Sequence, residues 1–448
     1  MNITVVFDIG RTNKKYLVFD ENYSVVEEYS EYLPETVDED GFPTEDLTLL
    51  TNWVRSHWQR ILDNPEYNVR SVNATAYGAS FVHLNESHKP VGPLYSYLKP
   101  LPEVFAKQFN ARHGSPSDIA LQTGSPELGF LNSGKQLYWI KYARPELFQE
   151  IRTSLHLPQY IIYLLTGRKV TEYTSIGCHT ALWSFEMMDY HNWVKDEDLV
   201  RLFPPTIAAS SFVARQNGQM IQSGFGLHDS SSALLPYKLS FKEPFVLVST
   251  GTWCINFNPF NARPLTSDQL ASDCLHYMST EGSGVKASRL FMGREHDEQV
   301  ARIVSHFGVD PDFYKKVDFD EALAQENPTS FYPMTMEGNG PRPEKPEGIW
   351  DVSAYPSAEA AYHGLMKGLT ELLSISLSLI GVNDVQSIFI DGGFARSKVF
   401  TKLLAQKYKG THKVYSTELP QATALGAALH ITRPQSFEFP GEISLVEP

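Results

Sequence analysis

Residues 3–19 read ITVVF-DIGRTNKK-YLVF, two strand-like runs joined by a turn-rich connection. Both runs are built mainly from β-branched and aromatic residues, which favour extended backbone in a sheet. Residues 245–257 repeat this plan as FVLVS-TGTW-CINF, so a second hairpin opens the second half of the chain. A single hairpin of this kind is commonplace. Two hairpins, one opening each half, indicate an internally duplicated architecture.

Strand and helix patterns alternate along the rest of both halves. Further strand candidates are 70–76, 385–390 and 412–415, and helical periodicity covers 135–143, 145–166, 357–380 and 397–408. This alternation predicts α/β layers with largely buried sheets. A chain of 448 residues is too long for one ordinary core, so we expect two domains, residues 1–236 and 237–448. The Pro- and Gly-rich stretch 327–356 is expected to be a long surface loop.

The composition is that of a globular protein, with 42% apolar and 20% charged residues, which excludes a disordered or fibrous chain. A net charge of −14 argues against a nucleic-acid partner, because a phosphate backbone needs a basic face. The start, MNITVVFDIG, lacks the features of a signal peptide, and no window approaches the ~18–20 apolar residues of a membrane helix. Three cysteines without metal-type spacing are read as reduced thiols. These features predict a cytoplasmic protein.

Two turns could bind phosphate. In Asp8-Ile9-Gly10-Arg11-Thr12-Asn13-Lys14-Lys15, a glycine at a strand end lets backbone N–H groups approach phosphate oxygens, while Thr and Asn add donors. The carboxylate of Asp8 could hold Mg²⁺ through water. The turn Ser249-Thr250-Gly251-Thr252-Trp253 could bind another phosphate in the same way. The alternative for both segments is a plain hairpin turn.

Two further segments have a functional and a structural interpretation. In Ile390-Asp391-Gly392-Gly393-Phe394-Ala395-Arg396-Ser397, paired glycines at a strand-to-helix junction could let a base or ribose lie against backbone. The alternative is a tight turn with Ser397 as a helix N-cap. In Gly226-Leu227-His228-Asp229-Ser230-Ser231-Ser232-Ala233, Asp229 is either an N-cap carboxylate or a general base for phosphoryl transfer.

Other catalytic patterns are absent from the sequence or poorly placed. There is no GxxxxGK[ST] motif, no GxSxG motif, no HExxH motif and no paired CxxC, which argues against a P-loop enzyme, a hydrolase and a zinc enzyme. The stretch 282–287 loosely imitates a dinucleotide fingerprint but has no obvious strand before it. The charged run 294–298 is expected to be a solvated helix face.

Taken in order, these segments resemble the FGGY family of carbohydrate kinases over nearly the whole chain. DIGRTNKK and STGTW resemble its two phosphate loops, GLHDSSSA its catalytic-aspartate segment, and DGGFARS followed by QATALGAA its nucleotide-side ending. The resemblance implies two actin-like (ribonuclease H-like) α/β domains. It also implies ATP with Mg²⁺ in an interdomain cleft and a sugar bound by the first domain.

Carried over by position, the resemblance implies the following residue roles. Asp229 is the catalytic base, and Asp8 and Asp229 bind the metal through water. ATP and its phosphates are bound by Gly10, Thr12, Asn13, Lys15, Gly251, Thr252, Gly392 and Gly393. The sugar is bound by Gly78, Ser80, Tyr97 and His228.

Several positions depart from the family pattern. Gln136 stands where a Lys often precedes the linker Trp, Phe394 follows the paired glycines where a small residue is common, and Ser80 falls where rhamnulose and fuculose kinases tend to carry Asp. The His-Asp pair at 228–229 is still most similar to that branch. The expected substrate is a deoxy-ketohexose such as L-rhamnulose or L-fuculose, phosphorylated by a monomer or homodimer. The alternatives are a pentulose or polyol kinase, or a non-catalytic nucleotide-binding module.

Overall fold

The computed structural model describes residues 1–206, 210–326, 328–336, 340–341, 349–434 and 437–448. These residues form two compact units. The first unit comprises Met1–Ser240, His276–Gly284 and Gln421–Phe439, and the second comprises Phe241–Leu275, Val285–Pro420 and Pro440–Pro448. The expected boundary between residues 236 and 237 stays a prediction.

The first unit is built on a sheet whose strands run in the order β12-β13-β6-β1-β2-β3, with β14 also paired to β6. Its strands are β1 (Asn2–Ile9), β2 (Asn13–Phe19), β3 (Val25–Tyr32), β6 (Asn68–Ala76), β12 (Phe212–Gln216), β13 (Gln219–Ser223) and β14 (Leu227–His228). The hairpin β1–β2 is antiparallel, whereas β6 is parallel to β1, and β14 is parallel to β6. Three carboxyl-terminal strand ends, those of β1, β6 and β14, therefore meet at one edge.

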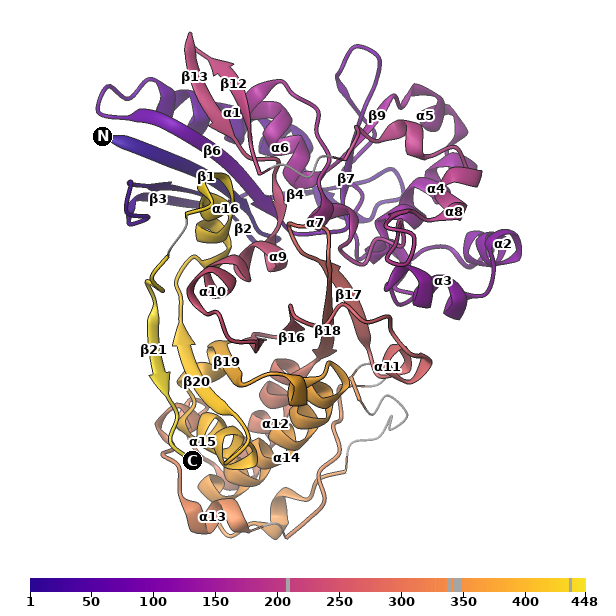
Figure 1. Cartoon of the computed structure of the whole chain (residues 1–448). Coiled ribbons are helices and arrows are strands. Elements are labelled where there is room, and N and C mark those ends of the chain that lie inside the picture. The colour runs from indigo at the N-terminus through magenta and orange to yellow at the C-terminus, as the bar shows by residue number, and fades with distance from the viewer. Residues whose placement is uncertain (207–209, 327, 337–339, 342–348, 435–436) are drawn as a thin grey trace. The chain divides into compact units, whose positions relative to one another are not determined.

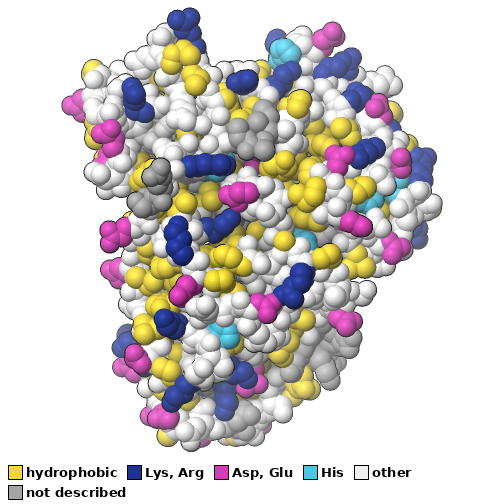
Figure 2. Space-filling view, viewed as in Figure 1, with side chains coloured by type: hydrophobic (Ala, Val, Ile, Leu, Met, Phe, Trp, Pro, Cys, Tyr) yellow, Lys and Arg dark blue, Asp and Glu magenta, His cyan; other side chains and the backbone are white. Residues whose placement is uncertain are grey.

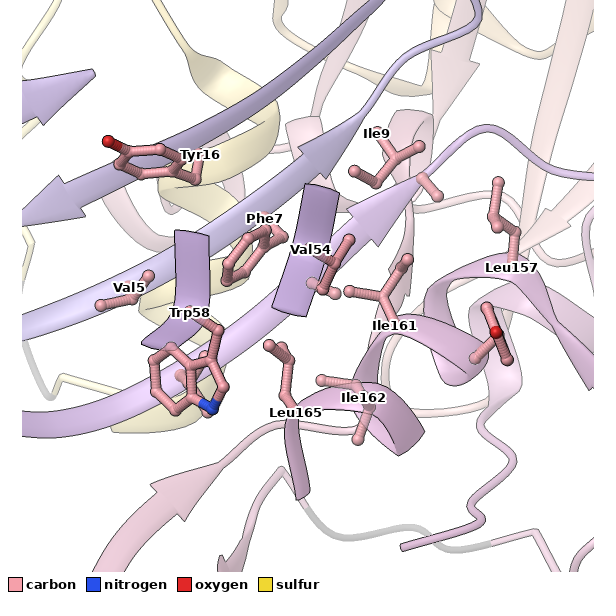
Figure 3. Close-up of a cluster of buried hydrophobic side chains, with 14 of the residues drawn as sticks. Val5, Phe7, Ile9, Tyr16, Val54, Trp58, Leu157, Ile161, Ile162 and Leu165 are labelled. Atoms are coloured by element: carbon pink, nitrogen blue, oxygen red, sulfur yellow. The ribbon is translucent and has the colours of Figure 1, made fainter. Parts of the chain in front are cut away.

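One face of this sheet is covered by α1 (Leu47–Leu62) and α6 (Leu157–Thr166), and Figure 3 shows their side chains packed against β1. Val5, Phe7 and Ile9 point to this face because side chains alternate along a strand. Burying each large apolar side chain contributes about 1.5–3 kcal/mol. The same alternation places Asp8 on the opposite face, where α16 (Ala422–Thr432) packs on β1 and β6.

The second unit repeats the strand pattern of the first. Its sheet has the order β17-β18-β16-β15-β19-β20-β21. The strands are β15 (Phe245–Thr250), β16 (Cys254–Asn258), β17 (Cys274–Met278), β18 (Gly284–Leu290), β19 (Ser387–Gly392), β20 (Lys413–Glu418) and β21 (Glu442–Leu445). As in the first unit, an antiparallel hairpin, β15–β16, lies beside a parallel strand, β19. The repeated hairpins of the sequence therefore correspond to equivalent places in two similar sheets.

Three helices pack on one another in the second unit: α12 (Met292–Phe307), α14 (Ala358–Leu379) and α15 (Lys398–Lys407). Ser357 caps α14 by accepting from the backbone N–H of Ala360, and Ser397 caps α15 by accepting from that of Phe400. These caps satisfy N–H groups that the helices cannot satisfy themselves. The N-cap role considered for Ser397 is thus confirmed.

The single helix predicted over 145–166 is wrong. The chain forms α5 (Pro145–Glu150), then the strand β9 (Thr153–His156), then α6. Pro158 explains the break, because proline lacks an N–H and fits only the first turn of a helix. The intervening residues pair with β7 (Phe81–Leu84) instead, with His156 opposite Phe81.

The solvated helix face predicted for 294–298 is also wrong for two of its residues. Glu295 and His296 lie on the buried side of α12, and Glu295 has no exposed surface. The Glu295 carboxylate accepts hydrogen bonds from the backbone N–H groups of Met334 and Thr335 and from the hydroxyl of Thr335. It also accepts from the side-chain amide of Gln299. A buried charge is tolerated here because donors surround it.

We expect Glu295→Ala to destabilise the protein by about 2–4 kcal/mol, because several buried donors would lose their acceptor. Its neighbour Glu298 provides a matched control, because its carboxylate forms only a half-exposed i,i+4 ion pair with Arg294, and Glu298→Ala should stay within about 0.5 kcal/mol. Urea unfolding of both variants checks this, and equal shifts in their midpoints would contradict the anchoring role of Glu295.

No helix among the described residues combines the length and apolar character needed to cross a membrane. On the face drawn in Figure 2, Lys and Arg side chains are interspersed with Asp and Glu side chains. This mixture is typical of an ordinary protein surface.

Candidate active site

Asp8 and Asp229 belong to one edge of the first unit's sheet. Asp8 lies in register with Thr75 of β6, and the residue before Asp229, His228, lies in register with Ala76 of the same strand. Asp229 follows β14 directly and is the first residue of the short helix α9 (Asp229–Ala233). The carboxyl ends of neighbouring parallel strands are where α/β folds commonly bind ligands. The sheet thus gathers residues that are far apart in the chain.

The two carboxyl groups have raised pKa values. Burial raises the pKa of Asp229 to about 6, although the hydrogen bond from Ser230 acts to lower it. About a third of the Asp229 side chain (34%) is nevertheless exposed. Burial, and then the negative charge of Asp229, raises the pKa of Asp8 to about 7, while Lys15 opposes this shift. Neighbouring carboxyl groups with raised pKa values mark a place where a cation or a proton is favoured.

His228 contacts Asp229 directly, with its Nε2 atom 3.1 Å from Oδ1 of the carboxylate. Burial lowers the pKa of His228 to about 3, so the imidazole is neutral. His228 occupies the N-cap position of α9, and Asp229 is the first residue inside the helix. The N-cap interpretation of Asp229 is therefore wrong, although its carboxylate does accept from the backbone N–H of Ser230.

Two tyrosines and a charged cluster stand close to this edge. Tyr77 follows β6, and its ring lies 5.8 Å from that of Tyr97. Burial raises the pKa of Tyr97, and the charges of Arg11 and Asp229 both act on it. Glu45 accepts from the Lys14 ammonium at 2.8 Å, lies 3.6 Å from the Arg11 guanidinium and hydrogen-bonds the Tyr77 side chain. Hydroxyl and guanidinium donors beside aromatic rings are suited to a polar ligand with one apolar face.

Gly78 and Ser80 shape the loop after β6. A Cβ atom on Gly78 would lie 2.6 Å from Cys178 Sγ and 3.0 Å from the His228 ring, so only glycine fits. Ser80 is buried, and its carbonyl accepts from the backbone N–H of Leu157. Gln136 is buried too and donates from its amide to the carbonyl of Ala79 and to that of Phe130, both at 2.7 Å. Gln136 therefore holds the loop that carries Gly78.

The predicted phosphate-loop residues divide between the two units. In the first unit, Gly10 donates its N–H to the carbonyl of Asn13 at 3.0 Å, and Thr12 and Asn13 are exposed at the turn. The Lys15 ammonium lies 3.7 Å from Glu28, which accepts from Gln421 as well. The first turn therefore presents polar groups beside Asp8.

The second hairpin has the same construction in the second unit. Gly251 donates its N–H to the carbonyl of Trp253, and both Gly251 and Thr252 are exposed. The carbonyl of Thr252 accepts from the first turn of α12, at Gly293 and Arg294. A Cβ on Gly293 would lie 2.1 Å from the Gly251 carbonyl oxygen, so this close approach requires glycine.

A cavity of about 680 Å³ opens beside this hairpin, wholly within the second unit. Its lining includes Gly251, Thr252 and Gly393, the rings of His296, Tyr362 and Phe394, and the cations Lys315, Lys316, Arg396 and Lys398. This size and mixture of groups are typical of small-ligand sites.

Gly392 lines a separate, smaller cavity with Asp391 rather than the one that Gly393 lines. Its φ angle is +90°, and a Cβ there would lie 2.0 Å from the Thr250 carbonyl oxygen. The Thr250 hydroxyl donates to the Asp391 carbonyl and accepts from the Phe394 N–H, which ties β15 to the paired glycines. Gly392 thus shapes the turn that presents Gly393.

These residues fit a nucleotide and a hard divalent cation. Aromatic rings with cations and open glycine backbone match a base joined to phosphates. The partly exposed carboxyl pair Asp8 and Asp229 offers oxygen ligands, which Mg²⁺ prefers.

Sequence reasoning missed several residues: Arg11, Glu45 and Tyr77 in the first unit, and His296, Tyr314 and Tyr362, which line the cavity of the second unit. For His296 a signal was present, because Met292, Gln299, Val300 and Ile303 follow the same helical spacing. For Glu45 and Tyr77 the sequence contains no periodic signal, because their contacts join distant segments.

A duplicated α/β fold, with a carboxylate pair in one unit and a nucleotide-sized cavity in the other, is the architecture of a phosphotransferase acting on a small hydroxyl compound. The chain belongs to the FGGY family of carbohydrate kinases. The model of the family's N-terminal domain matches residues 3–228, and that of its C-terminal domain matches residues 242–438. The predicted family, two-domain fold and enzyme class are thereby confirmed.

Similar proteins support the same class. The chain is 22% identical to a rhamnulokinase of Halalkalibacterium halodurans, over 95% of this chain and 92% of that one, and 23% identical to a rhamnulokinase of Oceanobacillus iheyensis, over 80% and 77%. The structure of a carbohydrate kinase from Novosphingobium aromaticivorans is similar with a TM-score of 0.84 and 25% identity, covering 99% of this chain and 96% of that one. A xylulose kinase from Lactobacillus acidophilus, with a TM-score of 0.79 and 15% identity over 100% and 94%, shares the fold.

Proposed function

We propose that this sugar kinase transfers the γ-phosphoryl group of MgATP to a hydroxyl of a deoxy-ketohexose such as L-rhamnulose, with Asp229 as general base. The observation that carries the proposal is the position of Asp229 beside β6, at the strand edge that also holds Asp8. Phosphoryl transfer needs positioned groups more than covalent chemistry. A carboxylate at the end of a rigid strand supplies such positioning.

The raised pKa of Asp229, about 6, suits this role. At neutral pH the carboxylate is mostly ionised, yet it takes a proton more readily than an ordinary Asp. As the sugar hydroxyl attacks phosphorus, its proton would pass to the Asp229 carboxylate. His228, neutral and in contact with Asp229, lies beside the carboxylate without supplying a charge.

The remaining residues bind and orient the two substrates. Gly251 has no side chain and would let phosphate oxygens approach the exposed backbone, where Thr252 adds donors. Gly10, Thr12, Asn13 and Lys15 would play the corresponding part at the turn of the first unit. Gly393 and the aromatic side chains of the second unit's cavity would hold the adenosine. Asp8 and Asp229 would bind Mg²⁺ through water, and the ion supplies positive charge that offsets the phosphate oxygens.

Two observations support a deoxy-ketohexose. Curated relatives that match most of this chain are named rhamnulokinases. In addition, the Tyr77 and Tyr97 rings lie near the charge of Arg11, and a methyl-bearing sugar presents both apolar and hydroxyl surfaces. Gly78, Ser80, Tyr97 and His228 are therefore proposed as sugar-binding residues.

ADP release over a panel of ketoses and polyols tests the substrate. We expect the highest kcat/KM for L-rhamnulose, with L-fuculose next, and lower values for D-xylulose, L-ribulose and glycerol. A preference for xylulose or glycerol would contradict the deoxy-ketohexose assignment. ATP binding without ADP release on any sugar would favour a non-catalytic nucleotide-binding module.

A further inference from the structure

Three side chains that can bind a metal ion lie close together near Asp229 in the first unit. Cys178, His179 and His228 are all buried, and one ligand atom from each lies within 4.8 Å of the others. Cys178 Sγ is 3.2 Å from His179 Nε2. Cys178 Sγ and the His228 ring both lie over Gly78, where a side chain would exclude them. The cluster is assembled by the fold, since His228 is distant from the other two in the sequence.

Hydrogen bonds from outside the cluster orient both imidazoles. His179 Nδ1 lies 3.0 Å from the carbonyl of Leu131, which can only accept, so Nδ1 carries the proton. His228 Nδ1 faces the Ser231 hydroxyl at 3.4 Å. Ser231 donates its own proton to the carbonyl of Met278 and therefore accepts from His228. Both Nε2 atoms then carry lone pairs, which is how histidines are oriented in metal sites.

The spacing of the cluster suits a tetrahedral metal site. In a tetrahedral site with bonds of 2.0–2.3 Å, ligand atoms are about 3.3–3.8 Å apart. The 3.2 Å between Cys178 Sγ and His179 Nε2 is close to that spacing, and no two ligand atoms of the cluster are more than 4.8 Å apart.

We infer that Cys178, His179 and His228 bind one Zn²⁺ ion, with water as the fourth ligand. Thiolate and imidazole ligands favour zinc over Mg²⁺ or Ca²⁺. The thiolate and the nearby carboxylate of Asp229 together offset the ion's charge, which a buried site requires. On binding, the Cys178 thiol releases its proton to solvent as the sulfur–zinc bond forms.

Zinc at this position would inhibit the enzyme, because the positive charge of an ion bound to His228, next to Asp229, would block the carboxylate from accepting the sugar proton. This consequence depends on the proposed role of Asp229, whereas zinc binding itself does not. A binding measurement without turnover therefore separates the two.

The test is a titration of the metal-free protein with Co²⁺, whose thiolate complexes absorb in the near ultraviolet. We expect one equivalent to give a thiolate-to-cobalt charge-transfer band, and Zn²⁺ to abolish it by displacement. Cys178→Ser should remove the band and weaken zinc binding by about 100-fold or more, and Ser231→Ala should weaken it by about 10–100-fold. Cys254→Ser is the matched control, a buried cysteine of the second unit, and should leave the band unchanged.

Circular dichroism establishes that each variant is folded. If Cys178→Ser does not fold, His179→Gln provides the same test, with loss of tight zinc binding expected. Absence of a band at one equivalent of cobalt, or a band that persists in Cys178→Ser, would overturn the zinc site whether or not the enzyme is active. If the cobalt band appears but zinc does not inhibit ADP release, the metal site is supported and the proposed blocking of Asp229 is refuted.

Discussion

Replacing Asp229 by Asn should lower turnover by about 10²–10⁴-fold, because the amide cannot accept the proton of the attacking hydroxyl. The substitution keeps the size of the side chain and an oxygen for the Ser230 N–H, which donates to Asp229. The cavity of the second unit contains no contribution from Asp229, so affinity for the nucleotide itself, measured without Mg²⁺, should remain. Steady-state ADP release and calorimetric binding of a non-hydrolysable ATP analogue measure the two effects separately.

Asp198→Asn makes the same chemical change at a control position in the same unit. Asp198 is largely exposed and pairs only with its neighbour Arg201, so both turnover and ATP binding should be unchanged. Near-normal turnover in Asp229→Asn would show that Asp229 is not the general base. An equal loss in both variants would point to a general effect on folding.

Gly251→Val should weaken ATP binding by about 100-fold, or about 2.7 kcal/mol, while leaving the protein folded. A Cβ at Gly251 would meet only the Trp253 carbonyl oxygen, at an ordinary contact distance of 3.6 Å. The added side chain therefore has room in the protein itself but projects where phosphate oxygens would approach the backbone. Calorimetry with the ATP analogue measures the affinity, and thermal unfolding measures the stability.

Gly392→Ala should behave in the opposite way. Its Cβ would collide with the Thr250 carbonyl oxygen at 2.0 Å, and its φ angle of +90° disfavours any side chain. This variant should unfold at a lower temperature than the unsubstituted protein, whatever its effect on ATP binding. Undiminished ATP affinity in folded Gly251→Val would exclude the second hairpin from phosphate binding.

The sequence predicted the central strands of both sheets, and the helices α4 (Ser133–Ala143), α14 and α15, because their causes are local. β-branched runs at 3–7 and 245–249 form β1 and β15, and the run at 357–380 forms α14. Prediction failed at 145–166, where Pro158 splits an apolar run and pairing with β7 decides that part of it becomes a strand. Strand pairing depends on a partner distant in the chain, which local patterns do not reveal.

The residues of the candidate site also divide into those that local sequence predicts and those that depend on distant contacts. Glycines at turns can be predicted from the sequence, because a close approach or a positive φ angle requires them, as at Gly392. The burial of Glu295 was misjudged because its carboxylate is satisfied by backbone groups of residues 334 and 335, far along the chain. The grouping of Glu45 with Tyr77 and Arg11 was missed for the same reason.

By itself, then, the sequence determined the duplicated hairpins and the order of the glycine turns, because each is encoded within a few adjacent residues. Only the tertiary structure decided that Asp229 has Asp8 as an electrostatic neighbour and His228 and Cys178 beside it. The physical reason is that parallel strands bring their carboxyl ends to one edge whatever the length of chain between them. At that edge burial raises the pKa values of both carboxyl groups, and the charge of Asp229 raises that of Asp8 further.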